Sequence, residues 1–256
     1  MDEIQEVIKV TKYATRADMG AAAAVVVAQK IRQLLKEQES VNIVFAAAPS
    51  QNEFLASFQL HNIEWDRINA FHMDEYVGLS ANAPQGFGTF LKERLFSKVP
   101  FRSVHYLNGN APDLDAECSR YTQLLNKYPV DIVCLGIGEN GHLAFNDPPV
   151  ADFEDPKTVK VVELDNICRQ QQVNDGCFKL LEQVPEKALT LTIPALIRGK
   201  YLYCIVPSAL KAQAIYNTFY KEVGVLYPST ILRTHPNVSL FLDWQSSKML
   251  KGAPFL

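Results

Sequence analysis

The sequence predicts an α/β fold in which a mostly parallel central sheet is covered by helices on both faces. Two observations lead to this expectation. Apolar segments rich in β-branched residues alternate along the chain with segments of helical periodicity, which is the pattern of βαβ units. Segments such as VNIVF and DIVCLGI are apolar almost throughout, which indicates strands that are buried on both faces of a parallel sheet.

The expected elements can be placed in chain order. Strands are expected where short apolar runs stand between polar turns, and helices where apolar residues recur every three to four positions. Connections between parallel strands should be right-handed crossovers. The expected strands cover 41–48, 68–73, 103–108, 131–137, 159–164, 188–193, 201–207 and 238–243. The expected helices cover about 18–36, 53–60, 88–96, 114–127 and 210–220.

Composition narrows the class of protein. With 48% hydrophobic and 21% charged residues among 256 positions, the chain has the make-up of an ordinary globular protein. It shows no repeat and no linker, so we expect one domain over residues 1–256. The net charge is −3 and no stretch is strongly basic, which argues against nucleic acid as the main partner.

The apolar runs and the cysteines indicate a cytoplasmic protein. The longest apolar run, AAAAVVVA at 21–28, is too short to span a bilayer. The N-terminal MDEIQEVIKV has no apolar signal-peptide segment. None of the five cysteines is in CxxC spacing, so neither a disulfide framework nor a zinc site is indicated.

Polar segments follow four of the expected strands. In open parallel sheets, ligands bind outside the carboxyl ends of the strands. AAPSQNE, DEYVGL, GENGHLAFND and SALK occupy these positions. We therefore expect these four segments to converge in one cleft.

Two of these segments carry candidate acid/base groups. Asp74 directly follows a strand, where a partly desolvated carboxylate would suit a general base; the alternative is a solvated acidic turn. His142 lies in the glycine-rich loop GIGENGHLAFND, and imidazole titrates near neutral pH. Asn140 and Asp147 stand on either side of it and could orient the ring. The alternative is a turn with a solvated histidine.

Two other segments are candidates for anion binding. Ser50, Gln51 and Asn52 precede an expected helix, whose free N–H groups favour a phosphate, although the same residues could simply cap that helix. Lys211 could supply a countercharge. We also expect the glycine loop to contact the substrate through Gly138 and Gly141. GIGENG has the spacing GxGxxG, but HLAFNDPP follows it instead of a helical pattern, which argues against a dinucleotide.

The same residues carry a family resemblance. The segments FHMDEYVGL, YLNGNAPDLDAEC, DIVCLGIGENGHLAFNDP, VPEKALTLTIPAL and LRTHPNVSLFLD resemble those of the glucosamine-6-phosphate deaminase/isomerase family, in the family's order and over nearly the whole chain. This resemblance implies a Rossmann-like α/β fold, no redox cofactor, no metal and a homo-oligomer.

The resemblance also implies a reaction. Asp74 would move a proton between C2 and C1 of an open-chain amino-sugar phosphate, and His142 would assist ring opening. The aldose would become a ketose with release of ammonia, and Lys211 would bind the sugar phosphate. Remote binding energy from the phosphate would position the reacting carbons.

Several positions differ from the family pattern. Asn140 stands where aspartate is frequent, and Asp147 replaces the glutamate of FNEP. AAAPSQNEF replaces a glycine-rich PTGGTP-like phosphate loop, so side chains of Ser50, Gln51 and Asn52 would contribute instead. VNDGCF replaces an NSRFF-like segment with a phosphate-binding arginine, for which Arg169 is a candidate substitute. PPVADF replaces the allosteric serines after FNEP, so the family's allosteric activation is not expected here.

Most of these changes fall on the parts that hold the substrate. They leave open whether the substrate is glucosamine 6-phosphate, a galactosamine phosphate or another phosphorylated amino sugar. Two other functions remain as alternatives. One is a 6-phosphogluconolactonase-like hydrolase, which should lack the MDEY segment. The other is a non-catalytic sugar-phosphate-binding protein.

Overall fold

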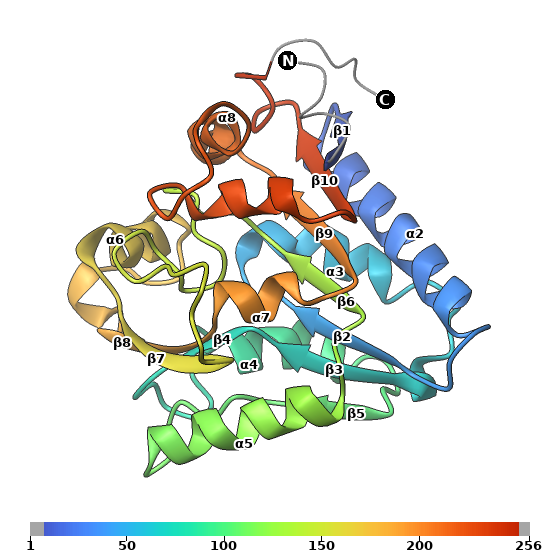
Figure 1. Cartoon of the computed structure of the whole chain (residues 1–256), viewed down its shortest axis with the longest axis horizontal. Coiled ribbons are helices and arrows are strands. Elements are labelled where there is room, and N and C mark those ends of the chain that lie inside the picture. Colours follow the sequence, from blue (N-terminus) through green and yellow to red (C-terminus); the bar gives the residue numbers. More distant parts are fainter. Residues whose placement is uncertain (1–7, 251–256) are drawn as a thin grey trace.

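Seven parallel strands form the centre of the molecule (Figure 1). The computed structural model describes residues 8–250. The strands lie in the order β1-β10-β9-β6-β2-β3-β5, and every neighbouring pair is parallel. The expected α/β class is confirmed. The strands are β1 Ile8–Tyr13, β2 Val41–Phe45, β3 Ile68–His72, β5 Ser103–His105, β6 Ile132–Leu135, β9 Tyr201–Val206 and β10 Val238–Asp243.

Helices cover both faces of this sheet. One apolar cluster packs α2 (Arg16–Leu34), α3 (Asn52–Phe58) and α4 (Phe87–Leu91) against one face. A second cluster packs α5 (Leu114–Lys127), α7 (Ile193–Ile197) and α8 (Ala212–Tyr220) against the other. Strand β2 shows why its sequence is apolar apart from Asn42: Ile43 and Phe45 enter the first cluster, whereas Val44 enters the second. Alternate residues of a strand point to opposite faces, so both faces must be apolar.

Three short strands form a separate antiparallel sheet. These are β4 (Asp74–Tyr76), β8 (Lys187–Leu191) and β7 (Val159–Glu163). The strands expected at 159–164 and 188–193 are therefore present but lie outside the central sheet, which the sequence pattern did not distinguish. Only Met73 separates β3 from β4, so the small sheet begins directly at the carboxyl end of β3.

The sequence did not predict β1, β4, α6 (Asn166–Asn174) or α7, and it simplified two helices. The segment expected as one helix at 88–96 is α4 followed by a π-helical segment, η3 (Lys92–Phe96). The segment expected from 210 begins with the 3₁₀ turn η5 (Ala209–Lys211) before α8. The remaining 3₁₀ turns are η1 (Pro49–Gln51), η2 (Trp65–Arg67), η4 (Leu181–Gln183) and η6 (Pro228–Thr234).

Side-chain caps explain where three helices begin. Thr15, Asp113 and Asp165 each accept a hydrogen bond from the backbone N–H three residues later. These caps start α2, α5 and α6 by satisfying a donor that has no partner inside the helix. The cap at Asp165 is the local signal for α6, whose sequence NICRQQQVN is mostly polar.

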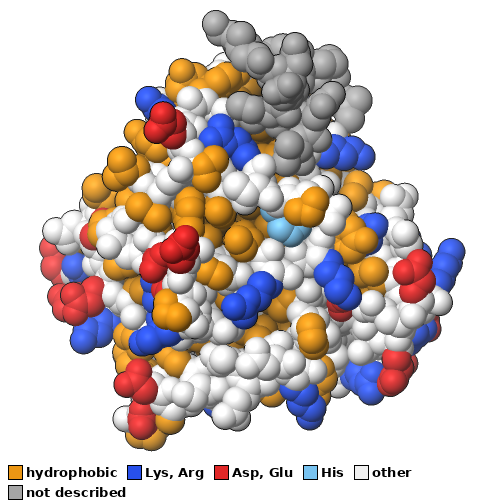
Figure 2. Space-filling model, viewed as in Figure 1, with side chains coloured by type: hydrophobic (Ala, Val, Ile, Leu, Met, Phe, Trp, Pro, Cys, Tyr) orange, Lys and Arg blue, Asp and Glu red, His pale blue; other side chains and the backbone are white. Residues whose placement is uncertain are grey.

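The part of the chain that the structure describes contains no candidate membrane span. No helix within residues 8–250 is long and apolar enough to cross a bilayer. On the face shown in Figure 2, basic and acidic side chains are scattered among polar and apolar ones. The expectation about a signal segment concerns the N-terminus, and residues 1–7 lie outside the described range. The extent of a single domain over 1–256 stays a prediction for the same reason.

Candidate active site

One pocket gathers side chains from the carboxyl ends of several parallel strands. Ser50 follows β2, Asp74 follows β3, His142 follows β6 and Lys211 follows β9, and all four line this pocket. The structure thus brings together the four polar segments that follow these strands in the sequence. Its other lining residues are Ala46, Ala47, Ala48, Met73, Phe87, Gly136, Ile137, Gly138, Ala144, Phe145, Gln171, Gln172 and Asp175.

Asp74 is a buried carboxyl at the wall of this pocket. It is 6% exposed and is held in register opposite Thr190 by the β4–β8 pairing. Burial, together with the charge of Glu75, raises the pKa of Asp74 well above its usual value. A carboxylate with raised proton affinity is better matched to taking up and returning a proton near neutral pH.

Glu75 turns away from the same pocket, as expected for neighbours on an extended segment. Its carboxylate accepts hydrogen bonds from the backbone N–H groups of Tyr76, Phe87 and Gly88. Glu75 therefore fixes the start of α4. Of the two adjacent acids, Asp74 is the one that can reach a molecule in the pocket.

His72 supports Asp74 from behind. Its ring is fully buried, and burial lowers its pKa to about 4. Leu107 donates its backbone N–H to His72 Nε2 at 2.9 Å, so the ring proton belongs on Nδ1. Nδ1 lies 2.9 Å from the carbonyl oxygen of Asp74 and can donate to it. The neutral ring thus anchors the backbone of Asp74.

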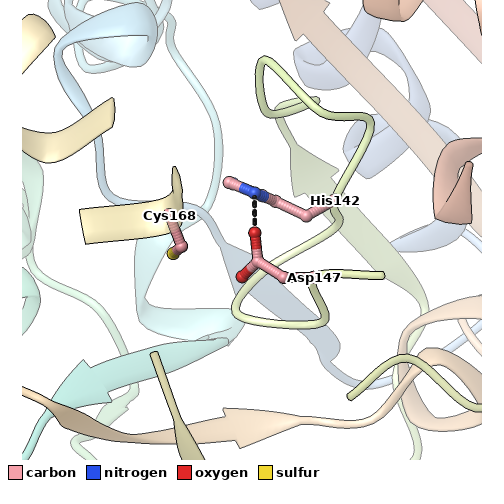
Figure 3. Close-up of side chains that lie close together, drawn as sticks. All are labelled: His142, Asp147 and Cys168. Atoms are coloured by element: carbon pink, nitrogen blue, oxygen red, sulfur yellow. Dashed lines mark hydrogen bonds and ion pairs between the residues drawn. The ribbon is translucent and has the colours of Figure 1, made fainter. Parts of the chain in front are cut away.

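His142 forms a hydrogen-bonded triad with Asp147 and Asn140. His142 Nδ1 lies 2.8 Å from Asp147 Oδ1 (Figure 3), and Asn140 Nδ2 donates to the same oxygen at 2.8 Å. Asn140 Oδ1 also accepts the backbone N–H of His142 at 3.0 Å. Both predicted neighbours of His142 therefore contact it, and Asp147 holds Nδ1 so that Nε2 is left for other partners.

The carboxyl of Asp147 is strongly buried. Burial alone would raise its pKa, but the charge of His142 and hydrogen bonds from His142, Asn140 and the Cys168 thiol outweigh it, so the pKa lies below its usual value. Asp147 therefore stays ionised. A carboxylate here favours the His142 tautomer with a proton on Nδ1 and stabilises the ring when it becomes charged.

Cys168 of α6 lies beside this pair (Figure 3). One donor atom each from His142, Asp147 and Cys168 lie within 4.8 Å of one another, which would suit a metal by residue type. However, the nitrogen and oxygen that would bind a metal already share a hydrogen bond. Burial also raises the pKa of the Cys168 thiol, whereas metal binding needs the thiolate. The arrangement favours hydrogen bonding over metal binding.

Glycines give the histidine loop its shape. A Cβ on Gly138 would lie 2.3 Å from two ring atoms of His142, so the ring packs where only glycine leaves room. Gly141 has a φ of +89° and donates its N–H to the Gly138 carbonyl at 3.0 Å. Gly138 lines the pocket, whereas Gly141 serves the turn behind it. Both glycines are required by the conformation of the loop, and only Gly138 lies where it could contact a molecule in the pocket.

The three polar residues at the start of α3, which were expected to precede it, have different surroundings. Ser50 lines the pocket. Gln51 is buried and donates through Nε2 to the Ile205 carbonyl at 3.1 Å, which ties the loop after β2 to β9. Asn52 Oδ1 accepts a hydrogen bond from Arg94 Nε at 2.8 Å. Of the three side chains, the structure places only that of Ser50 in the pocket lining.

Lys211 is buried at the floor of the pocket, with 4% of its surface exposed. Burial lowers its pKa, while the charges of Asp175 and Glu139 oppose that effect. Its Nζ lies 3.9 Å from Asp175 Oδ2, which is too long for a hydrogen bond. The donors of Lys211 Nζ are therefore not used by Asp175 and can serve an anion in the pocket.

Arg169 does not face the pocket. Its guanidinium donates to the carbonyl oxygens of Val184 and Leu181 at 2.9 to 3.2 Å, so it connects α6 to η4. The α6 segment instead contributes Gln171, Gln172 and Asp175 to the pocket. Sequence reasoning missed these three residues because it did not recognise α6; the Asp165 cap was the available signal.

The chain matches known sequences over most of its length. Residues 14–240 match a family model described as glucosamine-6-phosphate isomerases/6-phosphogluconolactonase. A glucosamine-6-phosphate deaminase of Exiguobacterium sp. is 38% identical over 186 residues, which cover 73% of this chain and 71% of that protein. A glucosamine-6-phosphate deaminase of Listeria monocytogenes is 36% identical over 211 residues, which cover 82% and 88% respectively.

Solved structures show the same fold. A monomeric glucosamine-6-phosphate deaminase superimposes with a TM-score of 0.85 at 29% identity, over 94% of this chain and 99% of that one. A 6-phosphogluconolactonase of Trypanosoma brucei gives a TM-score of 0.77 at 16% identity, over 94% and 98%. At that identity the second likeness concerns the fold alone.

Proposed function

This chain belongs to the family of glucosamine-6-phosphate isomerases and 6-phosphogluconolactonases, and we propose that it is an amino-sugar-phosphate deaminase. It would convert glucosamine 6-phosphate, or a close epimer, to the ketose phosphate and ammonia. The observation that carries this proposal is that Asp74 and His142 line one pocket while Asp147 holds the histidine ring. Relatives named for this activity share more than a third of the aligned residues.

Asp74 would act as the general base in the isomerisation. Its carboxylate would take the proton from C2 of the open-chain sugar and return it to C1, while one proton of the C2 amine passes to the C1 oxygen. The C2 amine thereby becomes an imine and the C1 aldehyde becomes a hydroxyl group. Water then replaces the imine nitrogen, which leaves as ammonia, and C2 becomes a ketone. The raised pKa of Asp74 supports both halves of the transfer, because the same group must accept and release the proton.

His142 is the group for ring opening. Because Nδ1 is held by Asp147, Nε2 can accept the proton of the C1 hydroxyl and pass it to the ring oxygen. This transfer opens the sugar and leaves the ring of His142 neutral again. Lys211 would hold the phosphate, so that binding energy distant from C1 and C2 fixes their position.

The alternative hydrolase uses less of the observed site. Lactone hydrolysis needs a histidine to activate water, but it gives no role to a buried carboxyl such as Asp74. The solved lactonases share the fold at low identity. In a non-catalytic binding protein, the His142–Asp147 pair would likewise have no function.

The proposed function is tested by ammonia release from glucosamine 6-phosphate, galactosamine 6-phosphate and the two unphosphorylated sugars, glucosamine and galactosamine. We expect release from one of the phosphorylated sugars, because Lys211 offers a buried cation to an anionic group. The same purified protein is also assayed for hydrolysis of 6-phosphogluconolactone. Lactone hydrolysis without ammonia release would replace the proposal by the hydrolase alternative.

The role of His142 is tested with His142→Gln. Loss of general acid/base assistance is expected to slow reaction of glucosamine 6-phosphate about 100-fold or more. An analogue lacking both the 4- and the 5-hydroxyl stays in the open-chain form, so its reaction should slow much less. The control is His61→Gln, since His61 lies outside the pocket. Equal slowing of both substrates would remove ring opening from the role of His142.

Three further properties are proposed on the same basis. The enzyme is placed in the cytoplasm and acts without a cofactor or metal, because proton transfer between carboxyl, imidazole and sugar needs neither. It is proposed to bind no nucleic acid, in line with its net charge of −3. A homo-oligomer remains a prediction, which sedimentation of the purified protein tests; one solved relative is described as monomeric.

A further inference from the structure

The floor of the pocket is short of positive charge for a phosphate. Lys211 is its buried cation, but the charges of Asp175 and Glu139 both act on it. Glu139 Oε1 is itself buried without a hydrogen-bond partner among the described residues. A sugar phosphate carries close to two negative charges at neutral pH. Lys211 alone, facing two carboxylates, does not balance that charge, so a second cation is needed.

Arg94 is a cation beside this pocket. It lines an adjoining hollow together with Pro49, Gly176 and Cys177. That hollow and the active-site pocket share the walls Ala47, Ala48 and Phe87, so the two lie side by side at the loop after β2. Arg169, the arginine that the sequence suggested, is committed to backbone carbonyls elsewhere.

The guanidinium of Arg94 is held in place. Its Nε donates to Asn52 Oδ1 at 2.8 Å, and its central carbon lies 3.9 Å from the centre of the Phe90 ring. Nη1 lies 3.8 Å from Glu93 Oε2, a weak contact at the surface. With Nε fixed and the terminal nitrogens only weakly engaged, the guanidinium can present two parallel N–H groups to an anion.

Cys177 links the two cations. Burial and the charge of Asp175 raise the pKa of the Cys177 thiol to about 11, while the charges of Arg94 and Lys211 both act to lower it. Both cations therefore lie near residues 175–177. This segment joins the two hollows, because Asp175 lines the active-site pocket with Lys211, whereas Gly176 and Cys177 line the adjoining hollow with Arg94.

We propose that Arg94, positioned by Asn52 and Phe90, is the second phosphate-binding residue of this enzyme and works together with Lys211. The inference rests on the proposed function, since it names a specificity residue of the same site. It also assigns Asn52 a role through Arg94 instead of through direct contact with the phosphate.

Arg94→Met tests the proposal. We expect the KM for glucosamine 6-phosphate, or for the epimer that the wild type uses, to rise about 10- to 100-fold, with kcat changed less than about threefold. The inhibition constant for inorganic phosphate should rise by a similar factor. Arg94→Lys should fall between wild type and Arg94→Met, because it keeps the charge but not the paired N–H groups.

Two other variants separate this role from a structural one. Arg102→Met removes a partly exposed arginine that pairs with Glu39 at 2.9 Å and should leave both constants unchanged. Asn52→Ala should raise the KM in the same direction as Arg94→Met but by less, because Arg94 remains. If Arg94→Met keeps the wild-type KM and phosphate inhibition, the role of Arg94 is overturned while the deaminase function stands.

If the wild type releases no ammonia from any sugar, the proposed function fails and the anion site is judged by binding. Inorganic phosphate should then raise the Tm of the wild type and of Arg102→Met. A shift that is lost in Arg94→Met supports the site, and an equal shift in all three proteins overturns it.

Discussion

Asp74→Asn is expected to lower kcat for ammonia release by about 10²- to 10⁴-fold while it raises the thermal stability of the protein near neutral pH. The activity is lost because an amide cannot accept the C2 proton. The shape of the site is retained, since asparagine is nearly isosteric and the β4–β8 pairing of residue 74 uses backbone groups. Substrate binding should therefore survive, and the KM should change little.

The gain in stability follows from the direction of the pKa shift. The folded-state pKa of Asp74 is raised by burial, so between the unfolded and folded pKa values the native state binds more protons than the unfolded state. Stability consequently falls as pH rises through that interval, and the full penalty is present above the folded pKa. Asparagine carries no such penalty. The Tm should rise by roughly 2–4 °C for each kcal/mol removed.

Scanning calorimetry at two pH values checks this explanation. The difference in Tm between Asp74→Asn and wild type should be present near pH 8 and become small near pH 3.5, where the carboxyl is protonated in the folded state and mostly protonated in the unfolded state. Asp66→Asn changes an exposed aspartate and serves as the control. A variant that keeps near-wild-type ammonia release would remove Asp74 from its role as base.

The pH dependence of kcat/KM reports the same group. Because the base must be ionised, activity should fall as pH falls through the pKa of Asp74. Burial places that pKa well above the usual value for aspartate, so the acid limb should lie well above pH 4. A profile of kcat/KM between pH 4 and 9 measures it. An acid limb at the ordinary aspartate pKa would contradict the desolvation of Asp74.

Gly138→Ala is expected to lower kcat/KM about 100-fold or more by displacing His142. The added Cβ would lie 2.3 Å from the ring, and the ring can yield only by giving up its 2.8 Å hydrogen bond to Asp147. That change removes the oriented Nε2 on which ring opening depends. The buried carboxylate also loses a partner, so a lower Tm should accompany the loss.

Steady-state kinetics on the closed sugar and on the analogue that cannot cyclise would locate the effect. The kcat/KM for the closed sugar should fall far more than that for the analogue, as with His142→Gln. Gly224→Ala is the matched control, because a Cβ there meets nothing within 4 Å. Wild-type kinetics in Gly138→Ala would mean that the imidazole of His142 works equally well in a shifted position. Close packing against His142 would then not explain why residue 138 is a glycine.

The central sheet could be predicted because its strands obey a simple rule. Strands such as β2 and β6 are buried on both faces and are almost entirely apolar. The rule that ligands bind at carboxyl ends then pointed to Asp74 and His142. The edge strand β1 was missed because only part of it is buried, so its sequence IKVTKY mixes apolar and polar residues. The short β4 was missed because three residues are too few to show the alternation of apolar and polar side chains that identifies a strand.

The surroundings of the site were harder to predict because they depend on contacts between distant segments. Nothing local to Gln51 shows that it binds Ile205, 154 residues away, or that Asn52 meets Arg94. Arg169 appeared suitable by its place in the sequence, but its direction is set by carbonyls of η4. Tertiary packing decides which partners these side chains bind, and the sequence pattern does not contain that information.

The small antiparallel sheet has a consequence for how this enzyme can diversify. Between β6 and β9 the chain carries β7, α6, β8 and α7, and α6 lends Gln171, Gln172 and Asp175 to the pocket. The histidine loop directly follows β6, but α6 contacts it as well: Gln171 Oε1 accepts the N–H of Glu139 at 2.8 Å, and Cys168 lies beside His142 and Asp147. Mutations in α6 can therefore change the substrate pocket and the histidine loop together. Substrate range and reaction chemistry are coupled through this one helix.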